Sequence, residues 1–398
     1  MSIFSGLVQA AIVTVLNLRT LRGRLASSGV AVVGMAGVVA VVVSVLSIGE
    51  GIRATMANTG APDSAIVLRT GVDTEMSSIL LRDDIVIVKD APEIARDPAV
   101  GPLASAELFV GVDLVKASKG TTAGASLRGV EPAAFRIRSF KMVKGRPFES
   151  GRNELIVGRA AAAEFRGLDV GSAIKLGQNA WTIVGIFDAG GTVPDSELWC
   201  DAGVLGPLYQ RGASRQSVYV RLTSPEAFKP FKDRLSTDPR VKLTAMRERE
   251  YYAGQSELLS GTIVIIGGII GFLMGMGALF VAVITMYSAV ASRTREIATL
   301  RALGFRGGPV VISVLIESLM LALVGGAVGA AVAYFGFNGY ETATMNWQNM
   351  SSIGFAFRVT PALLVLGVGW ALVLGFLGGL FPAIRAMRMP IVTALREL

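Results

Sequence analysis

Long uncharged stretches occur four times along the chain. Residues 25–49, 258–292 and 359–384 carry no charge, and in residues 307–340 only Glu317 is charged. A helix needs about 20 apolar residues to cross the hydrocarbon core of a bilayer, which is about 30 Å thick. The pattern therefore predicts four transmembrane helices.

Between the first two of these stretches, residues 53–255 alternate short apolar runs with polar turns. Strands are predicted at SAIVLR, DIVIV, NELIVG, SAIKLG, WTIVGIF, SVYVRL and RVKLTAM, with a hairpin turn at QNA. Helices are predicted at RAAAAEFRG and PEAFKPFKDRLS. The fold class is thus membrane α-helical, with an α+β extracytoplasmic domain between the first and second transmembrane helices.

The second uncharged stretch is longer than a bilayer requires. As a helix, its 35 residues would extend about 52 Å at about 1.5 Å per residue. Because the preceding MREREYYAGQSELL is also compatible with a helix, we expect a continuous stalk that carries motion between the external domain and the membrane.

These predictions divide the chain into nine segments. They are an N-terminal cytoplasmic or interfacial helix at 1–28, the first transmembrane helix at 29–52, the external α+β domain at 53–255, the second transmembrane helix with its stalk at 256–290, a cytoplasmic helix at 291–308, the third transmembrane helix at 309–335, a short periplasmic loop at 336–358, the fourth transmembrane helix at 359–384 and a cytoplasmic C-terminus at 385–398.

Composition supports a membrane protein, and the charges give its orientation. Hydrophobic residues make up 52% of the chain, charged residues only 17%, and the mean hydropathy is +0.56. The net charge of +8 lies within residues 1–29, 286–308 and 385–398. Since basic loops stay in the cytoplasm, both termini and the middle segment are predicted to be cytoplasmic. The basic character is thus a topology signal, and no nucleic-acid partner is expected.

Candidate catalytic chemistry is sparse. The chain has no histidine, one cysteine (Cys200), no phosphate-binding GxxxxGK[ST] motif and no metal-ligand spacing, so we expect neither an enzyme nor a metal site. Cys200 is interpreted as a packed thiol. Four acids are interpreted as solvated loop charges: Glu149, Glu154, Asp188 and Asp195.

The segment SRTREIATLRALG, residues 292–304, places a short charged helix between two uncharged stretches. Such a helix is not stable alone in water. It is either a solvated loop whose arginines enforce orientation, or a docking helix that a partner's groove receives.

Several motifs together carry a family resemblance. ASRTREIATLRALGF, the following IES and GGAVG, and the C-terminal GGLFPAIRAMRMPIVTALREL resemble the FtsX-like permeases of ABC transporters. NLRTLRGRLASSGVAVVGMAG is similar to that family's first helix, and RGVEP, KGRPF and GLDVGSAIKL are similar to its MacB-like periplasmic domain. The resemblance covers essentially the whole chain. It extends to the mechanotransmission group that includes MacB and the lipoprotein-releasing LolC and LolE.

The resemblance implies a coupling helix at about 291–305, seated on a separate ATPase subunit, since the chain lacks MacB's fused ATPase. Two ATPase copies would bind ATP and Mg, so no cofactor is expected in this chain. A second permease, identical or homologous, is implied, and a periplasmic adaptor and an outer-membrane channel are further candidate partners. The residues assigned to ATPase coupling are Arg293, Arg295, Glu296, Ile297, Leu300, Arg301 and Gly304.

Two functions fit this family. One is a permease that couples ATP hydrolysis to movement of the periplasmic domain and to export or extraction of a lipid, lipoprotein, peptide or drug. The alternative is an FtsX-like signalling module that regulates a periplasmic cell-wall hydrolase without transport. Either would lie in the bacterial inner membrane.

Other positions have competing interpretations. Arg385 and Arg388 contact either the ATPase or anionic membrane lipids. Glu317, a charge within a span, makes a structural hydrogen bond or serves a proton or substrate relay. Small residues spaced for close helix packing within the chain or between two permeases are Gly267, Gly271, Gly275, Gly325, Gly329, Gly375 and Gly379.

Overall fold

The structure is a computed structural model that describes residues 25–118, 120–303, 307–346 and 351–388. The chain forms two compact units. We call them the membrane unit (1–50, 261–340 and 357–398) and the α/β unit (51–260 and 341–356). The predicted N-terminal helix up to residue 24, Gly304 and the C-terminal segment from residue 389 lie outside the described residues.

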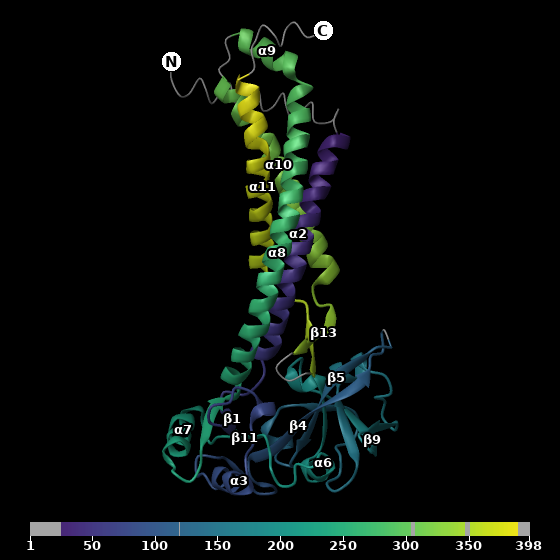
Figure 1. The fold of residues 1–398 in the computed structure, drawn as a ribbon, viewed down its shortest axis with the longest axis vertical. Coiled ribbons are helices and arrows are strands. Elements are labelled where there is room, and N and C mark those ends of the chain that lie inside the picture. Colours follow the sequence, from purple (N-terminus) through teal and green to yellow (C-terminus); the bar gives the residue numbers. More distant parts are fainter. Residues whose placement is uncertain (1–24, 119, 304–306, 347–350, 389–398) are drawn as a thin grey trace. The chain divides into compact units, whose positions relative to one another are not determined.

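Four long helices build the membrane unit, and the prediction of four apolar helices is confirmed. They are α2 (Leu25–Ala57), α8 (Glu248–Ala291), α10 (Gly307–Phe337) and α11 (Pro361–Arg388). Within this unit the helices lie side by side (Figure 1). Small and branched side chains fill the space between them, among them Val39, Val43, Ala322, Ala371 and Leu374.

The α/β unit is organised around a 10-stranded sheet with the order β12-β1-β11-β4-β5-β10-β7-β9-β6, and β8 pairs with β9. Its strands are β1 (Ser64–Arg69), β4 (Ala104–Val115), β5 (Thr122–Val130), β6 (Lys141–Gly145), β7 (Glu154–Gly158), β8 (Ala173–Leu176), β9 (Asn179–Asp188), β10 (Glu197–Asp201), β11 (Ser217–Arg221) and β12 (Leu243–Arg247). A separate short pair is formed by β2 (Arg96–Asp97) and β3 (Gly101–Pro102). The predicted α+β fold of this segment is confirmed.

Short helices accompany the strands. They are η2 (Glu75–Ser77), α3 (Arg82–Lys89), α4 (Ala134–Ile137), α5 (Arg159–Glu164), η3 (Val193–Ser196), α6 (Ala202–Leu208), η4 (Pro225–Ala227) and α7 (Phe228–Thr237).

The α/β unit has two halves with separate hydrophobic cores, and the second half holds a further buried cluster around Phe187 and Trp199. In the first half, β1, β11 and β12 pack with α3 and α7, around side chains such as Val88 and Phe231. In the second half, β5, β7, β9 and β10 pack with α5 and α6, around Leu127 and Trp181. β4 belongs to both halves, because its start pairs with β11 and the rest pairs with β5.

The prediction of a strand at DIVIV is wrong, because these residues form most of α3. The backbone N–H of Leu81 donates to Asp84 Oδ2 (2.9 Å), which satisfies a donor at the start of the helix. Ile85 and Val88, three residues apart, are buried on one face. A short apolar run fits a strand or a buried helix face equally well, and here the polar N-terminal turn favours the helix.

Within the segment expected to be a short loop, β13 (Glu341–Asn346) and β14 (Ser351–Ala356) pair as antiparallel strands. This strand pair packs within the α/β unit, where the Gly354 N–H donates to Ser196 Oγ at 2.8 Å. The Asn346 side chain donates to Gln255 Oε1 at 3.3 Å.

Candidate functional site

The candidate site is α9 (Thr294–Ala302), the short helix that follows α8. The chain turns at Arg293, where the backbone leaves the helical conformation, and the Thr294 hydroxyl caps the end of α8 by donating to the Ala291 carbonyl (2.8 Å). Glu296 lies in the first turn of α9 and Arg301 in the last, as the helix dipole favours.

Apolar packing attaches α9 to the membrane unit. Ile297 and Ala298 are buried, and Ile297 belongs to a cluster with Val290 of α8 and Val310 and Val314 of α10. A nine-residue helix is too short to be stable alone, so this contact holds it in place.

A buried ion pair adds a second attachment. Arg293 Nη1 lies 3.1 Å from Glu317 Oε2 of α10, and each residue is 4% exposed. A buried ion pair adds little net stability, but separating its partners leaves an uncompensated buried charge, which is costly. The pair therefore fixes the turn between α8 and α9 to one position along α10.

A cavity of about 20 Å³, room for about one water molecule, lies beside this pair. Arg293, Glu296 and Glu317 line it, together with apolar side chains that include Leu300 and Val314. The cavity is too small for a transported molecule.

The sequence-predicted coupling residues divide into two groups. Arg295 and Glu296 are exposed, and Leu300 and Arg301 are half-buried, so that their side chains reach the surface of the chain. Arg293 and Ile297 are buried and bind α9 to α10. Gly304 lies outside the described residues.

Glu317, one of the intramembrane candidates, has its structural partner in Arg293. The sequence does not indicate this pairing, because Arg293 lies 24 residues away from Glu317. From the sequence, Arg293 is instead predicted to contact the ATPase. The C-terminal arginines Arg385 and Arg388 are both exposed on the last turn of α11. Arg385 Cζ lies 5.5 Å from the centre of the Tyr287 ring of α8.

The predicted packing glycines all face other helices of the same chain. A side chain added at Gly267 or Gly271 would meet α2, and one added at Gly275 would meet Trp370 of α11. The glycines of α10 approach α2, and those of α11 approach α10: they are Gly325 and Gly329, and Gly375 and Gly379.

Comparisons with known proteins agree with this architecture. A model of the MacB-like periplasmic core domain matches residues 28–238, and one of the FtsX-like permease C-terminal region matches residues 258–391. The features define a membrane permease with a MacB-like α/β domain. The chain belongs to the family of MacB-type, FtsX-like ABC transporter permeases, which confirms the resemblance seen in the sequence.

Individual relatives share between about a quarter and a third of their residues with this chain over the matched regions. The chain is 32% identical over 151 residues to the uncharacterized ABC transporter permease YknZ of Bacillus subtilis, covering 38% of this chain and 36% of that protein. It is 23% identical over 415 residues to the macrolide export ATP-binding/permease protein MacB of Bdellovibrio bacteriovorus, covering 95% of this chain and 60% of that protein. The chain thus spans less than two thirds of the length of either relative.

Among solved structures, the periplasmic region of MacB from Actinobacillus actinomycetemcomitans matches 50% of this chain and 92% of that chain. The identity is 14% and the TM-score is 0.36. The extracellular domain of YknZ matches with 15% identity and a TM-score of 0.34, over 46% of this chain and 99% of that chain.

Proposed function

We propose that the chain is the permease subunit of a mechanotransmission-type ABC transporter. ATP hydrolysis on a partner ATPase moves α9, and this movement drives the α/β unit and the export or extraction of a substrate. ATP and Mg bind to two copies of the ATPase. A second permease, identical or homologous, completes the membrane part, and an adaptor protein and an outer-membrane channel are candidates to receive the substrate.

The observation that carries this proposal is the two-sided character of α9. Its inner side is held to α10 by Ile297 and by the neighbouring Arg293–Glu317 pair. Its outer side presents Arg295 to a partner, and Glu296, at the edge of the small cavity beside the pair, is exposed as well. When charges of both signs meet a complementary groove, they attract the helix and also fix the position in which it binds. A solvated loop that only enforces orientation would need no such attachment.

Charge supports the orientation that this mechanism needs. The net charge of +8 lies within 1–29, 286–308 and 385–398, and the second of these segments contains α9. The positive-inside rule then places α9 and both termini in the cytoplasm, where ATP is available, and the α/β unit in the periplasm. The membrane is accordingly the bacterial inner membrane.

Site-directed photocrosslinking tests the coupling role. A photoreactive amino acid replaces Arg295 in the full chain in native membranes, and a second variant carries it at Lys229, an exposed cation of α7. We expect an adduct with an ABC ATPase from position 295 and none from position 229. An adduct-free position 295 in membranes that contain the ATPase would contradict the role of α9.

Mass spectrometry of proteins that co-purify in mild detergent separates the two family functions. An ATPase with an adaptor supports export. An ATPase with a peptidoglycan hydrolase, and no exported substrate, supports the signalling alternative.

A further inference from the structure

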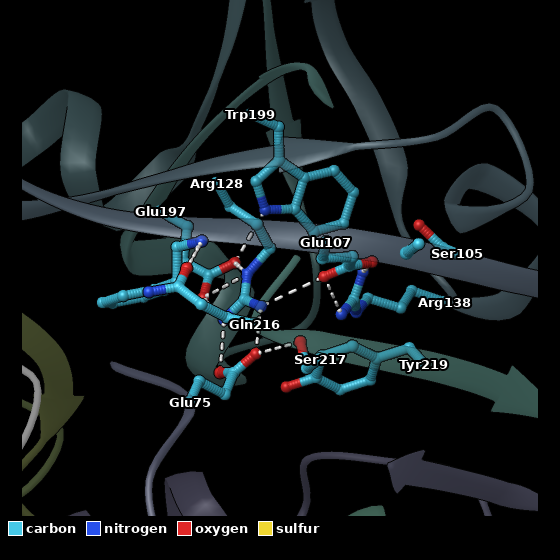
Figure 2. Close-up of polar contacts among 12 residues, drawn as sticks. Glu75, Ser105, Glu107, Arg128, Arg138, Glu197, Trp199, Gln216, Ser217 and Tyr219 are labelled. Carbon is cyan, nitrogen blue, oxygen red and sulfur yellow. Dashed lines mark hydrogen bonds and ion pairs between the residues drawn. The ribbon is translucent and has the colours of Figure 1, made fainter. Parts of the chain in front are cut away.

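Five charged side chains are buried together where the two halves of the α/β unit meet (Figure 2). Arg128 of β5, only 1% exposed, is at their centre. Its guanidinium binds Glu75 of η2 (2.7 and 3.0 Å), Glu107 of β4 (3.0 Å) and Glu197 of β10 (2.8–3.1 Å). Arg138 binds Glu107 through two further hydrogen bonds (2.6 and 2.8 Å). We call these five residues the charge cluster.

The charge cluster is fully satisfied although it holds three carboxylates and two guanidinium groups. Each carboxylate oxygen accepts at least one hydrogen bond, and additional donors are the Ser217 hydroxyl and the indole N–H of Trp199. The Arg138 guanidinium also lies 4.0 Å from the centre of the Tyr219 ring. Complete satisfaction makes a buried polar network rigid, since moving any member leaves another without its partner.

The charge cluster bridges the two halves. Glu107 lies at the point where β4 stops pairing with β11 and starts pairing with β5. Glu75 comes from the segment that links β1 and α3 in the first half, whereas Arg128 and Glu197 lie on strands of the second half. A single guanidinium therefore ties together elements that the two separate hydrophobic cores do not.

The first turns of α8 are attached to the same cluster. Tyr251 and Tyr252 are each 4% exposed. The Tyr251 hydroxyl accepts a hydrogen bond from the backbone N–H of Glu75 (3.3 Å), and the Tyr252 hydroxyl lies 3.2 Å from that of Tyr219. A small cavity beside the cluster is lined by Arg128, Tyr252 and Gln255 and by residues of β14. Because α8 continues unbroken to Ala291, these contacts join the cluster to the helix that precedes α9.

We propose that Arg128 is the positioning residue of force transmission: it locks both halves of the α/β unit and the first turns of α8 into one rigid body. This inference rests on the proposed function, in which α8 carries the movement of α9. A displacement of α8 would then move the whole α/β unit, without first being absorbed by a hinge between its halves. Tyr251 and Tyr252 are the link from α8 to the cluster.

The requirement for arginine follows from its shape. The planar guanidinium reaches three carboxylates from different elements through fixed donors, and a lysine ammonium is a point charge with three donors on a flexible chain. Arg128→Lys therefore keeps the charge but loses the fixed geometry. Arg221→Lys in β11 is the matched control, because Arg221 binds only the half-buried Asp63 in the contacts described for it (2.9 Å).

Two distances between spin labels in the purified full-length protein test the proposal. Cysteines replace exposed Lys229 (α7, first half) and Lys175 (β8, second half) for one distance, and Lys229 and exposed Glu257 (α8) for the other. The native Cys200 is completely buried and is not expected to react with the label. Both distance distributions should be narrow in the parent protein and in Arg221→Lys.

Arg128→Lys should broaden both distributions, whereas the double variant Tyr251→Phe/Tyr252→Phe should broaden only the distance to α8. The phenylalanine variant keeps the rings and the charge cluster, so it remains informative if Arg128→Lys does not fold. Narrow distributions in Arg128→Lys, or an unchanged distance to α8 in the phenylalanine variant, would overturn the proposal.

ATPase measurements separate this proposal from the proposed function. If the chain couples to an ATPase, the phenylalanine variant should retain permease-stimulated ATP hydrolysis while losing the nucleotide-dependent change in the α/β unit. If no ATPase is stimulated by the parent protein, the proposed function fails, but the label distances still decide whether Arg128 fixes the two halves and α8.

Discussion

The two units bury charge in different ways. The membrane unit buries the ion pair Arg293–Glu317, which joins the turn before α9 to α10. The α/β unit buries the charge cluster, in which Arg128 alone serves three carboxylates. The cluster has an excess of one carboxylate and depends on neutral donors such as Ser217 to satisfy it.

This difference has an energetic consequence. A one-to-one pair can be removed as a unit, and two apolar side chains of similar volume then often restore the stability. A cluster around a shared arginine cannot be removed by any two substitutions, because the remaining carboxylates lose their partner. We therefore expect the pair to hold two elements together locally. We expect the cluster to hold several elements together, so that no single member can be removed without weakening all of these contacts.

The largest effect is expected from Arg128→Met. It would leave Glu75, Glu107 and Glu197 buried with too few donors, and should lower the free energy of unfolding of the α/β unit by at least about 3–5 kcal/mol. Arg221→Met, which breaks a partly exposed pair with Asp63, should cost about 1 kcal/mol or less.

Denaturant unfolding of the purified protein, followed by tryptophan fluorescence, measures both changes. Trp199 donates to Glu197 of the charge cluster and Trp181 lies in the second core, so in a background with Trp370 of α11 replaced by phenylalanine the signal reports this unit. Equal effects of the two arginine substitutions would remove the distinction between cluster and ordinary ion pair.

The next largest effect concerns the membrane pair and sharpens the comparison. Arg293→Met or Glu317→Leu alone leaves one buried charge and should destabilise the membrane unit by about 3 kcal/mol. The double variant should lose clearly less stability than the two single losses added together, because neither charge of the pair is then left without the other. Thermal unfolding in lipid nanodiscs measures the stability of the parent protein, the two single variants and the double variant. Additive losses in the double variant would show that the two residues act separately.

The same contrast explains what could be predicted from the sequence. The four apolar helices were predictable because each is encoded by a continuous run of residues. Glu317 was noticed because it interrupts such a run. The pairing of Glu317 with Arg293 could not be predicted, because two residues 24 positions apart produce no local pattern in the sequence.

The charge cluster was not foreseen at all. Arg128 and its partners are separated by 21, 53 and 69 residues, and each lies in a segment of ordinary composition. Two of the acids interpreted as solvated, Glu154 and Asp195, are in fact buried. Glu154 pairs with Arg146, and Asp195 accepts backbone N–H groups, so burial followed from partners that the loop sequence did not reveal. That interpretation was wrong for these two residues.

A smaller effect is expected where the membrane unit relies on close packing. A Cβ atom at Gly329 of α10 would clash with the Ala36 carbonyl oxygen of α2, so Gly329→Ala forces the two helices apart. We expect a loss of about 1–3 kcal/mol. Gly336 lies on the same helix with open space around it, and Gly336→Ala should be neutral or slightly stabilising, since alanine favours helices.

Thermal unfolding in nanodiscs compares the two glycine variants. If Gly329→Ala and Gly336→Ala both lower the stability, close approach to α2 is not the reason for glycine in α10.

The smallest expected effect is on pH dependence, and it tests the cluster without breaking it. Burial acts to raise the pKa of Glu75, but the charge and hydrogen bonds of Arg128 outweigh burial and hold this pKa below its ordinary value. A carboxyl whose pKa is lowered on folding contributes stability above its ordinary pKa and loses it as the pH falls below that value. The stability that Glu75 contributes to the α/β unit should therefore be lost in acid below about pH 4.5.

Glu75→Gln isolates this contribution. The variant should be less stable than the parent protein at neutral pH. The difference should shrink by about 1 kcal/mol per pH unit or less as the pH falls below about 4.5. Burial raises the pKa of Asp195 and of Glu248, the first residue of α8, which gives the opposite slope. Both carboxyls are present in both proteins, so their contributions largely cancel in the difference. Urea unfolding of both proteins between pH 3 and 7 measures this difference in stability. A difference independent of pH would show that Arg128 does not hold Glu75 in its charged form, and the charge cluster would then be no different in kind from a neutral hydrogen-bonded network.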